Sequence, residues 1–177
     1  MGGINTYSYV RSAPTSRIDP TGQDALVVVG GMRSLSNPFG HASIAITGAG
    51  LYSFGTGNKC GDAVGKFLLD QASVRHQWAF IIKTSPAQDA RMLKYLKQFS
   101  QCRTAGKIDN CAYRTQHALQ AAGVETNDPT LGAPGGTPGS LLQSLLVQAA
   151  AGQITEVEIP QGANPSIDTS PYEPSTN

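Results

Sequence analysis

Short apolar runs, separated by glycine, proline and other turn formers, indicate a chain with several strands. The first run, Ala25 to Val29, is wholly apolar and has the length of a buried strand. Gly48-Ala49-Gly50 forms a tight turn between two further runs and predicts a hairpin. Strands are expected at residues 24–30, 41–47, 51–56, 74–83 and 154–159.

Helical spacing of apolar residues marks other segments, and two of them have clear end signals. Ser85 and Gln88 form a capping box with Pro86 at the first helical position, so a helix is predicted from there. A second helix is expected from residues 109–110, both good N-cap types, to a C-cap glycine at Gly123.

The last third of the chain is rich in proline and glycine. Ser140 is predicted to cap a short amphipathic helix that runs to Ala149, whereas residues 62–70 have only a weak helical pattern. Residues 160–177 carry four prolines and several Ser and Thr residues, which predicts a disordered tail. The expected organisation is a leading segment at 1–23, a folded domain at 24–159 and the tail at 160–177.

Composition narrows the class of protein. The chain has 177 residues, of which 40% are hydrophobic and 14% charged, so it can bury a core. A formal net charge of +1 argues against a DNA or RNA partner, because phosphate binding needs a basic surface. No apolar run approaches the ~20 residues of a membrane helix, and the N-terminus lacks signal-peptide features.

Three cysteines, an odd number, leave at least one thiol without a partner in the chain. Cys111 directly follows two helix-capping residues, Asp109 and Asn110, and the positive end of the helix dipole there favours a thiolate. A buried structural cysteine is the alternative interpretation. Cys60 and Cys102 can pair in an oxidising compartment, which would leave Cys111 free, but sequence does not show their proximity.

A nucleophilic thiol needs a base, and the chain has three histidines. His117 lies six residues after Cys111, about 120° round the same helix, and is expected at the surface. His76 lies in a strand pattern and is expected to be a core or edge residue. His41 opens a strand directly after Gly40, where a side chain can project from the sheet towards a helix terminus.

At the N-terminus, residues 2–10 read G-G-I-N-T-Y-S-Y-V, and Pro14 and then D-P-T-G at 19–22 follow. This segment resembles the conserved end of the Rhs (rearrangement hotspot) repeat core. In that family a hollow β-cocoon closes at this point, and aspartyl self-cleavage releases the toxin that follows. Asp19 matches the family's D-P motif, whereas Gln23 stands where the family usually has an aliphatic residue.

Four further motifs lie in the following hundred residues, 24–123: G-H-A-S-I-A-I at 40–46, Y-S-F-G at 52–55, D-N-C at 109–111 and A-L-Q-A-A-G at 118–123. With these motifs the segment looks like a permuted NlpC-type papain-like hydrolase, a group that includes the lecithin:retinol acyltransferase-like enzymes. The resemblance implies an α+β fold, an antiparallel sheet packed against helices with the nucleophile at a helix N-terminus. It also implies that Cys111 is the nucleophile, His41 the base and Ser53 the third catalytic residue.

These resemblances imply a secreted antibacterial effector that hydrolyses an acyl bond through a thioester intermediate, without a metal or other cofactor. Membrane phospholipid is the favoured substrate, and a peptidoglycan peptidase or amidase of the same fold is the alternative. A non-catalytic binding module is the alternative from another class. The helix 141–149 and the loop 37–39 are candidates for an acyl groove, with ordinary core and ordinary loop as the other interpretation.

The expected partners follow from that function. They are the substrate, the parent Rhs cocoon and a cognate immunity protein, with a membrane surface as a further candidate and no nucleic acid. Delivery into a target cell, with action at the periplasm or cell envelope, is the expected localisation. A type VI secretion system is one route that this context suggests.

Overall fold

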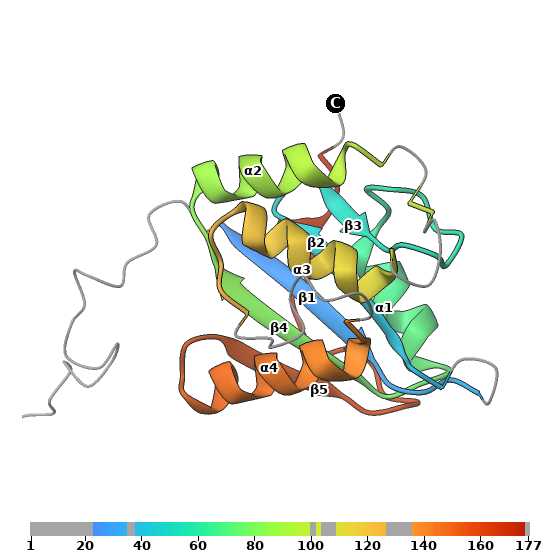
Figure 1. The fold of residues 1–177 in the computed structure, drawn as a ribbon. Helices are drawn as coiled ribbons and strands as arrows, with labels where there is room; N and C mark the ends of the chain where they lie inside the picture. The colour runs from blue at the N-terminus through green and yellow to red at the C-terminus, as the bar shows by residue number, and fades with distance from the viewer. Residues whose placement is uncertain (1–22, 35–37, 100–101, 104–108, 127–135, 176–177) are drawn as a thin grey trace, which may run out of the picture.

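The computed structural model describes residues 23–34, 38–99, 102–103, 109–126 and 136–175. The leading segment 1–22, with the Rhs-like motif and Asp19, lies outside the described residues. The described chain has an α+β fold, as expected, with one five-stranded sheet and four α-helices (Figure 1).

Every neighbouring pair of strands in the sheet is antiparallel, and the strand order is β3-β2-β1-β4-β5. The hairpin expected around residues 48–50 joins β2 to β3. The strand predicted from Val74 begins three residues later, at Gln77. The strands are β1 (Asp24–Gly30), β2 (His41–Ile46), β3 (Gly50–Tyr52), β4 (Gln77–Lys83) and β5 (Thr155–Ile159).

Helices cover both faces of the sheet and create two apolar cores. On one face, β1 and β2 pack against α2, α3 and α4 in the larger core, which includes Ile44, Phe80 and Leu119. On the other face, α1 and the C-terminal segment pack over Leu26 and Val28. The helices are α1 (Val64–Ala72), α2 (Pro86–Leu96), α3 (Cys111–Ala121) and α4 (Pro138–Ala150).

Local capping residues begin three of the four helices. The Ser85–Gln88 capping box at α2 is present as predicted, and Gly123, with φ +70°, follows the end of α3. The prediction that Ser140 caps the last helix is wrong: Thr137 is the cap, and Ser140 is the third helical residue of the same capping box. The Thr-Pro-Gly-Ser sequence therefore begins α4 three residues before the predicted start.

The C-terminal segment corrects the expectation of a disordered tail. Residues 160–175 fold back over the α1 face, and Tyr172, in the short 3₁₀ helix η2 (Ser170–Tyr172), is 2% exposed. The Glu173 carboxylate accepts hydrogen bonds from the Val64 and Gly65 N–H groups, at 3.1 and 2.8 Å. An acidic group is favourable at a helix N-terminus, so this segment supplies the cap that α1 lacks locally.

Candidate active site

Cys111 is the first residue of α3, and its sulfur contacts β2. Asn110 caps the helix, with its side-chain oxygen accepting from the Tyr113 N–H at 3.0 Å and its amide donating to Gly136 O at 3.0 Å. The Ala42 N–H donates to Cys111 Sγ at 3.4 Å. Because this N–H belongs to the peptide that joins His41 to Ala42, the thiol lies within one peptide unit of the histidine backbone.

His41 is the first residue of β2, and the backbone before it admits only glycine. Gly40 has φ +78°, and a Cβ there would lie 2.3 Å from the carbonyl oxygen of Gly30. The close approach brings β2 in beside the end of β1, where His41 pairs with Gly30. The imidazole that follows is buried, with 7% of the residue exposed.

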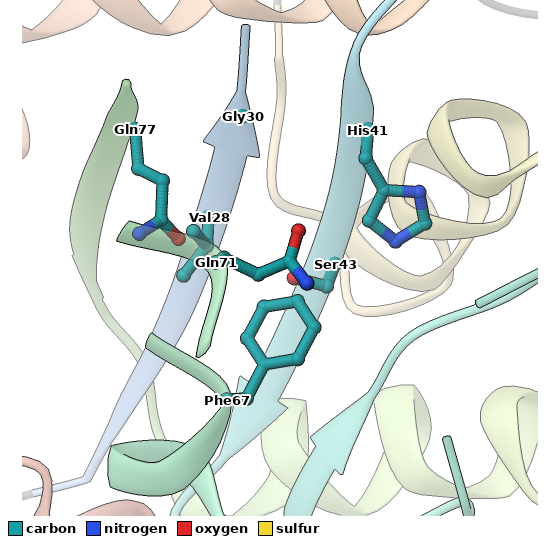
Figure 2. A pocket seen from close by; sticks show the side chains of 7 residues that line it. All are labelled: Val28, Gly30, His41, Ser43, Phe67, Gln71 and Gln77. Carbon is teal, nitrogen blue, oxygen red and sulfur yellow. The ribbon is translucent and has the colours of Figure 1, made fainter. Parts of the chain in front are cut away.

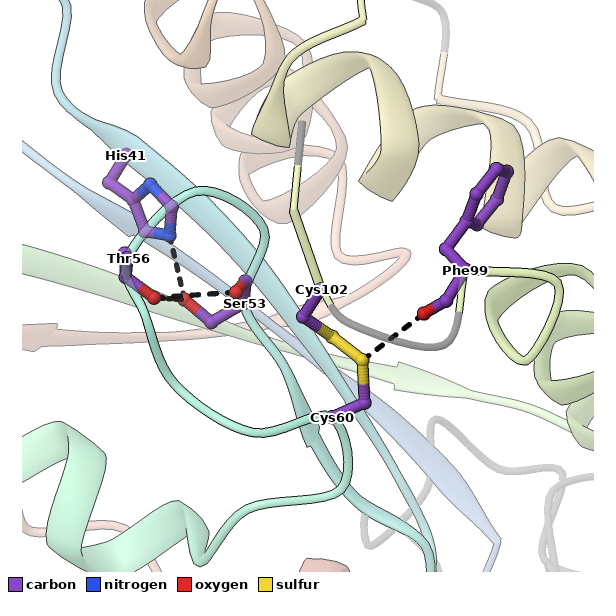
Figure 3. Close-up of a disulfide and its surroundings, with 6 residues drawn as sticks. All are labelled: His41, Ser53, Thr56, Cys60, Phe99 and Cys102. Carbon is purple, nitrogen blue, oxygen red and sulfur yellow. Dashed lines mark hydrogen bonds between the residues drawn. A yellow bond between two sulfur atoms is a disulfide. The ribbon is translucent and has the colours of Figure 1, made fainter. Parts of the chain in front are cut away.

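Ser53 and Thr56 complete a hydrogen-bonded series that begins at His41 (Figure 3). His41 Nε2 lies 2.9 Å from Ser53 Oγ, and that oxygen lies 2.9 Å from Thr56 Oγ1. Thr56 Oγ1 in turn donates to the Ser53 carbonyl at 3.3 Å. Ser53 is fully buried, so its partners are fixed by the protein and not by bulk water.

The carbonyl at the end of this series determines the direction of each hydrogen bond. A carbonyl only accepts, so the Thr56 hydroxyl donates to it and must accept from the Ser53 hydroxyl. Ser53 Oγ then accepts from His41, which assigns the proton to Nε2. His41 Nδ1 is left with a free lone pair, as a general base requires.

Burial makes both reactive groups neutral. It lowers the pKa of His41 to about 4, with a further contribution from the positive charge of Arg75. Burial also raises the pKa of the Cys111 thiol, against the opposing effect of backbone N–H donors and Arg75. The expectation that the helix terminus favours a thiolate is therefore wrong in its net effect, because desolvation outweighs the dipole.

The contact that the thiol makes is with the backbone beside His41. Among the described residues, Cys111 Sγ and His41 share no hydrogen bond, and the His41–Ala42 peptide forms the contact between them. Catalytic hydrogen bonds are often long in a free enzyme and shorten when substrate binds.

The other two histidines have other neighbours. The ring of His117 packs against that of Tyr113 at a tilt, with ring centroids 4.0 Å apart, and burial lowers its pKa. His76 Nε2 lies 2.9 Å from a Glu158 carboxylate oxygen on β5. Neither has a described contact with Cys111.

Cys60 and Cys102 form a disulfide, with Cα atoms 5.4 Å apart, and Cys111 is the free thiol (Figure 3). The bond joins the loop after β3 to the segment after α2. The Gly55 N–H also donates to the Cys102 carbonyl at 2.9 Å. Both contacts hold the loop that carries Ser53 and Thr56, the residues that orient His41.

Three buried polar atoms lie without hydrogen-bond partners beside His41, and the sequence did not reveal them. They are Ser43 Oγ, Gln71 Oε1 and Gln77 Oε1. The same residues, with His41, line a small pocket between the sheet and α1 (Figure 2). Other buried polar atoms without partners lie elsewhere in the described residues, so what distinguishes these three is that they share one pocket with His41.

Thr56 and Arg75 were also missed. Thr56 carries no sequence signal beyond its place in a glycine-rich loop. Arg75 precedes β4 and resembles any surface arginine in sequence, yet only 3% of it is exposed. Its Nη1 donates to the carbonyl of Gly31, next to the cross-strand partner of His41, and its charge lowers the pKa of both His41 and Cys111.

The two segments expected to form an acyl groove differ in their exposure to solvent. Leu141 and Leu145 of α4 are fully buried in the larger core, so they act as ordinary core residues. Phe39, two residues before His41, is 72% exposed, and Met32, just after β1, is 61% exposed. These two side chains give the surface beside the site an apolar character.

The described residues contain no cluster of three or more His, Cys, Asp or Glu side chains arranged to hold a metal ion. Within those same ranges, no helix combines the length and apolar character needed to span a bilayer. No protein-family model, curated protein or solved structure matches the chain. The site is therefore interpreted from its own chemistry.

Proposed function

We propose that the protein is a cysteine hydrolase in which Cys111 is the nucleophile, His41 the general base and Ser53 the residue that orients His41. The observation that carries the proposal is the contact of Cys111 Sγ with the His41–Ala42 peptide. The proton on His41 Nε2, fixed by Ser53, supports it, because Nδ1 is then free to accept the thiol proton.

The reaction proceeds in two balanced halves. His41 Nδ1 takes the thiol proton while Sγ attacks the acyl carbonyl, and N–H groups at the start of α3 stabilise the oxyanion. The tetrahedral intermediate expels the leaving group, which takes the proton from the imidazolium, and a thioester to Cys111 remains. His41 then deprotonates a water molecule that hydrolyses the thioester and restores the thiol.

Phospholipid ester is the proposed substrate. Met32 follows the end of β1 and Phe39 precedes His41 by two residues, both are exposed, and exposed apolar side chains near a site favour contact with lipid. A peptidoglycan amide is the second candidate, because the same thiol and imidazole can cleave an amide. A non-catalytic binding module is the third, and it predicts no turnover of either substrate.

The proposed fold family is the permuted papain-like group. The chain order supports it, since the strand that begins at His41 precedes the helix that begins at Cys111. The Rhs-like segment at residues 2–22 supports a role as an antibacterial toxin released from an Rhs cocoon and neutralised in the producing cell by an immunity protein. The Cys60–Cys102 disulfide supports action in the periplasm or envelope, because disulfides persist in oxidising compartments.

The decisive experiment measures products by mass spectrometry after the protein is incubated with phospholipid vesicles or with purified muropeptides. The wild type is expected to release fatty acid and lysophospholipid, and Cys111→Ala is expected to release neither while it keeps the wild-type circular dichroism spectrum. Muropeptide cleavage without lipid cleavage would favour the amidase. No turnover of either substrate by the wild type would contradict the enzymatic proposal.

The compartment is tested separately by expression with and without an export signal in a susceptible strain. Growth arrest is expected only with export and only when Cys111 is intact. Equal killing without export would contradict action at the periplasmic side, and would favour a lipid substrate at the cytoplasmic face over the cell wall.

A further inference from the structure

Arg75 lies buried at the end of the sheet, in a position that a glycine makes possible. A Cβ at Gly30 would lie 2.5 Å from Arg75 Cδ, so the arginine stem occupies the space that Gly30 leaves open. Nη1 donates to the Gly31 carbonyl at 3.3 Å. The side chain is thereby held against the last residues of β1, with only 3% of the residue exposed.

The charge of Arg75 has no anionic partner among the described residues. No carboxylate there forms an ion pair with it, and its Nε is buried without a hydrogen-bond partner. Burial and the nearby charge of Arg33 both lower the pKa of Arg75. An unpaired buried cation costs several kcal/mol, and binding an anion offsets that cost.

Arg75 also lies next to the reacting groups. Gly30, against which its stem packs, is the cross-strand partner of His41. Burial raises the pKa of the Cys111 thiol overall, and the charge of Arg75 acts on that pKa in the opposite direction. An anionic group bound to the Arg75 guanidinium would therefore be part of the substrate whose carbonyl Cys111 attacks.

We propose that Arg75, with Arg33, binds the phosphate diester of a glycerophospholipid and positions its acyl ester at Cys111. The choice of phospholipid rests on the proposed function. Arg33 is exposed and receives the phosphate at the surface, whereas Arg75 holds it deeper with planar, charge-assisted hydrogen bonds. Met32 is exposed directly beside Arg33, and an apolar residue beside a basic one suits the boundary between headgroup and acyl chain.

The test measures binding and does not depend on turnover. Cys111→Ala protein is titrated calorimetrically with dihexanoylphosphatidylglycerol below its micelle concentration, and with uncharged dihexanoylglycerol. The phospholipid is expected to bind at least about tenfold more tightly, and inorganic phosphate is expected to compete with it. Equal affinity for the two lipids would overturn the proposal.

Variants in the same Cys111→Ala background separate binding from folding. Arg75→Gln is expected to abolish the preference for phospholipid, Arg75→Lys to keep part of it, and exposed Arg33→Gln to reduce it a few-fold. Lys94→Gln, an exposed site on α2 that removes the same charge, is the matched control and should change nothing. If Arg75→Gln does not fold, an unchanged preference in Arg33→Gln together with no competition by phosphate overturns the proposal.

A further titration distinguishes the anion's source. A stem tripeptide with free carboxylates is added to the same Cys111→Ala protein. Binding of that peptide in an Arg75-dependent manner, without binding of the phospholipid, would overturn the lipid assignment. If only the enzymatic proposal fails, the protein would still bind the phospholipid more tightly than the uncharged lipid, but the wild type would not hydrolyse it.

Discussion

At the end of the sheet where β1 begins, polar side chains are paired with one another. Lys83 Nζ lies 2.9 Å from a carboxylate oxygen of Asp24, and the Thr47 hydroxyl donates to the Asp24 carbonyl at 2.8 Å. At the opposite end, where Gly30 meets His41 and Gln77, buried polar atoms lack partners. We call these the paired end and the site end.

The difference teaches where this fold retains groups that stability alone would not favour. A buried polar atom without a partner costs about 1–3 kcal/mol, so several at one end need a reason beyond packing. At the paired end every residue just named has a partner within the chain. At the site end, Arg75 and the imidazole of His41 are instead arranged beside a free thiol, Cys111.

The largest expected effect is a difference in kcat/KM between alanine variants of His41 and His117. His41→Ala should lower kcat/KM for phospholipid hydrolysis about 1,000-fold, because it removes the base next to Cys111. His117→Ala should stay within about threefold of wild type, because its ring packs against Tyr113. Steady-state fatty acid release measures both. An essential His117 with a dispensable His41 would show that the site end has been assigned to the wrong residues.

The second prediction concerns the disulfide that holds the site end. The Cys60→Ser/Cys102→Ser variant should lose about 4 kcal/mol of unfolding free energy, since the bond closes a loop with a sequence separation of 42. Urea denaturation measures the loss. Cys111→Ser, which breaks no bond, is the control and should remain near wild type. A double variant within about 1 kcal/mol of wild type would mean that the bond does not constrain the unfolded chain.

The third prediction uses the pKa of His41, which burial lowers to about 4 from 6.5. Between these values the unfolded chain binds a proton that the folded protein does not bind. Stability is therefore fully present above about pH 6.5 and falls as the pH decreases towards 4, by at most about 3 kcal/mol. Urea denaturation from pH 7 to 4 measures the effect.

His41→Asn is the control for this pH dependence. Burial also lowers the pKa of His117, so the wild type and the variant share that contribution, and the difference between them isolates His41. The wild type should lose more stability on acidification than His41→Asn. Parallel pH profiles would show that the imidazole is not buried as a neutral group, and would remove the argument for Nδ1 as a ready base.

Local signals explain why much of the fold was predictable. Ser85 and Gln88, which cap α2, lie three residues apart, and Asn110 caps α3 by accepting from an N–H three residues later. A short stretch of sequence is therefore enough to predict where both helices begin. The start of α1 was not predictable, because its cap is Glu173, more than a hundred residues away in sequence. The same contact explains why a proline-rich tail, disordered by composition, is ordered here.

The residues of the candidate site likewise include some that local sequence predicts and some that it does not. Cys111 and His41 were identifiable because each follows a residue with a strong local preference, Asn110 and Gly40. Arg75 was not, because its burial depends on the space left by Gly30 on another strand. The thiol pKa was predicted in the wrong direction for a related reason: the helix terminus is local, whereas desolvation depends on everything packed around it.

The smallest expected effect compares two threonines, one at each end of the sheet. Thr56 accepts from the Ser53 hydroxyl, and that bond keeps the proton of His41 on Nε2. Thr56→Val frees the Ser53 hydroxyl to donate to Nε2 instead, which would shift the imidazole proton towards Nδ1 and reduce the fraction of His41 that can act as the base. We expect kcat to fall about tenfold, equivalent to about 1.4 kcal/mol, with KM nearly unchanged.

Thr47→Val is the matched change at the paired end, where Thr47 bonds only the backbone of Asp24, at 2.8 and 3.0 Å. It should cost about 1 kcal/mol of stability and leave kcat unaltered. Nitrogen-15 chemical shifts of the His41 ring distinguish the two cases, because only Thr56→Val should move the Nδ1 resonance towards its protonated value. Equal losses of kcat in both variants, with unchanged ring shifts, would reduce Thr56 to a structural residue and leave the two ends of the sheet without a functional difference at this position.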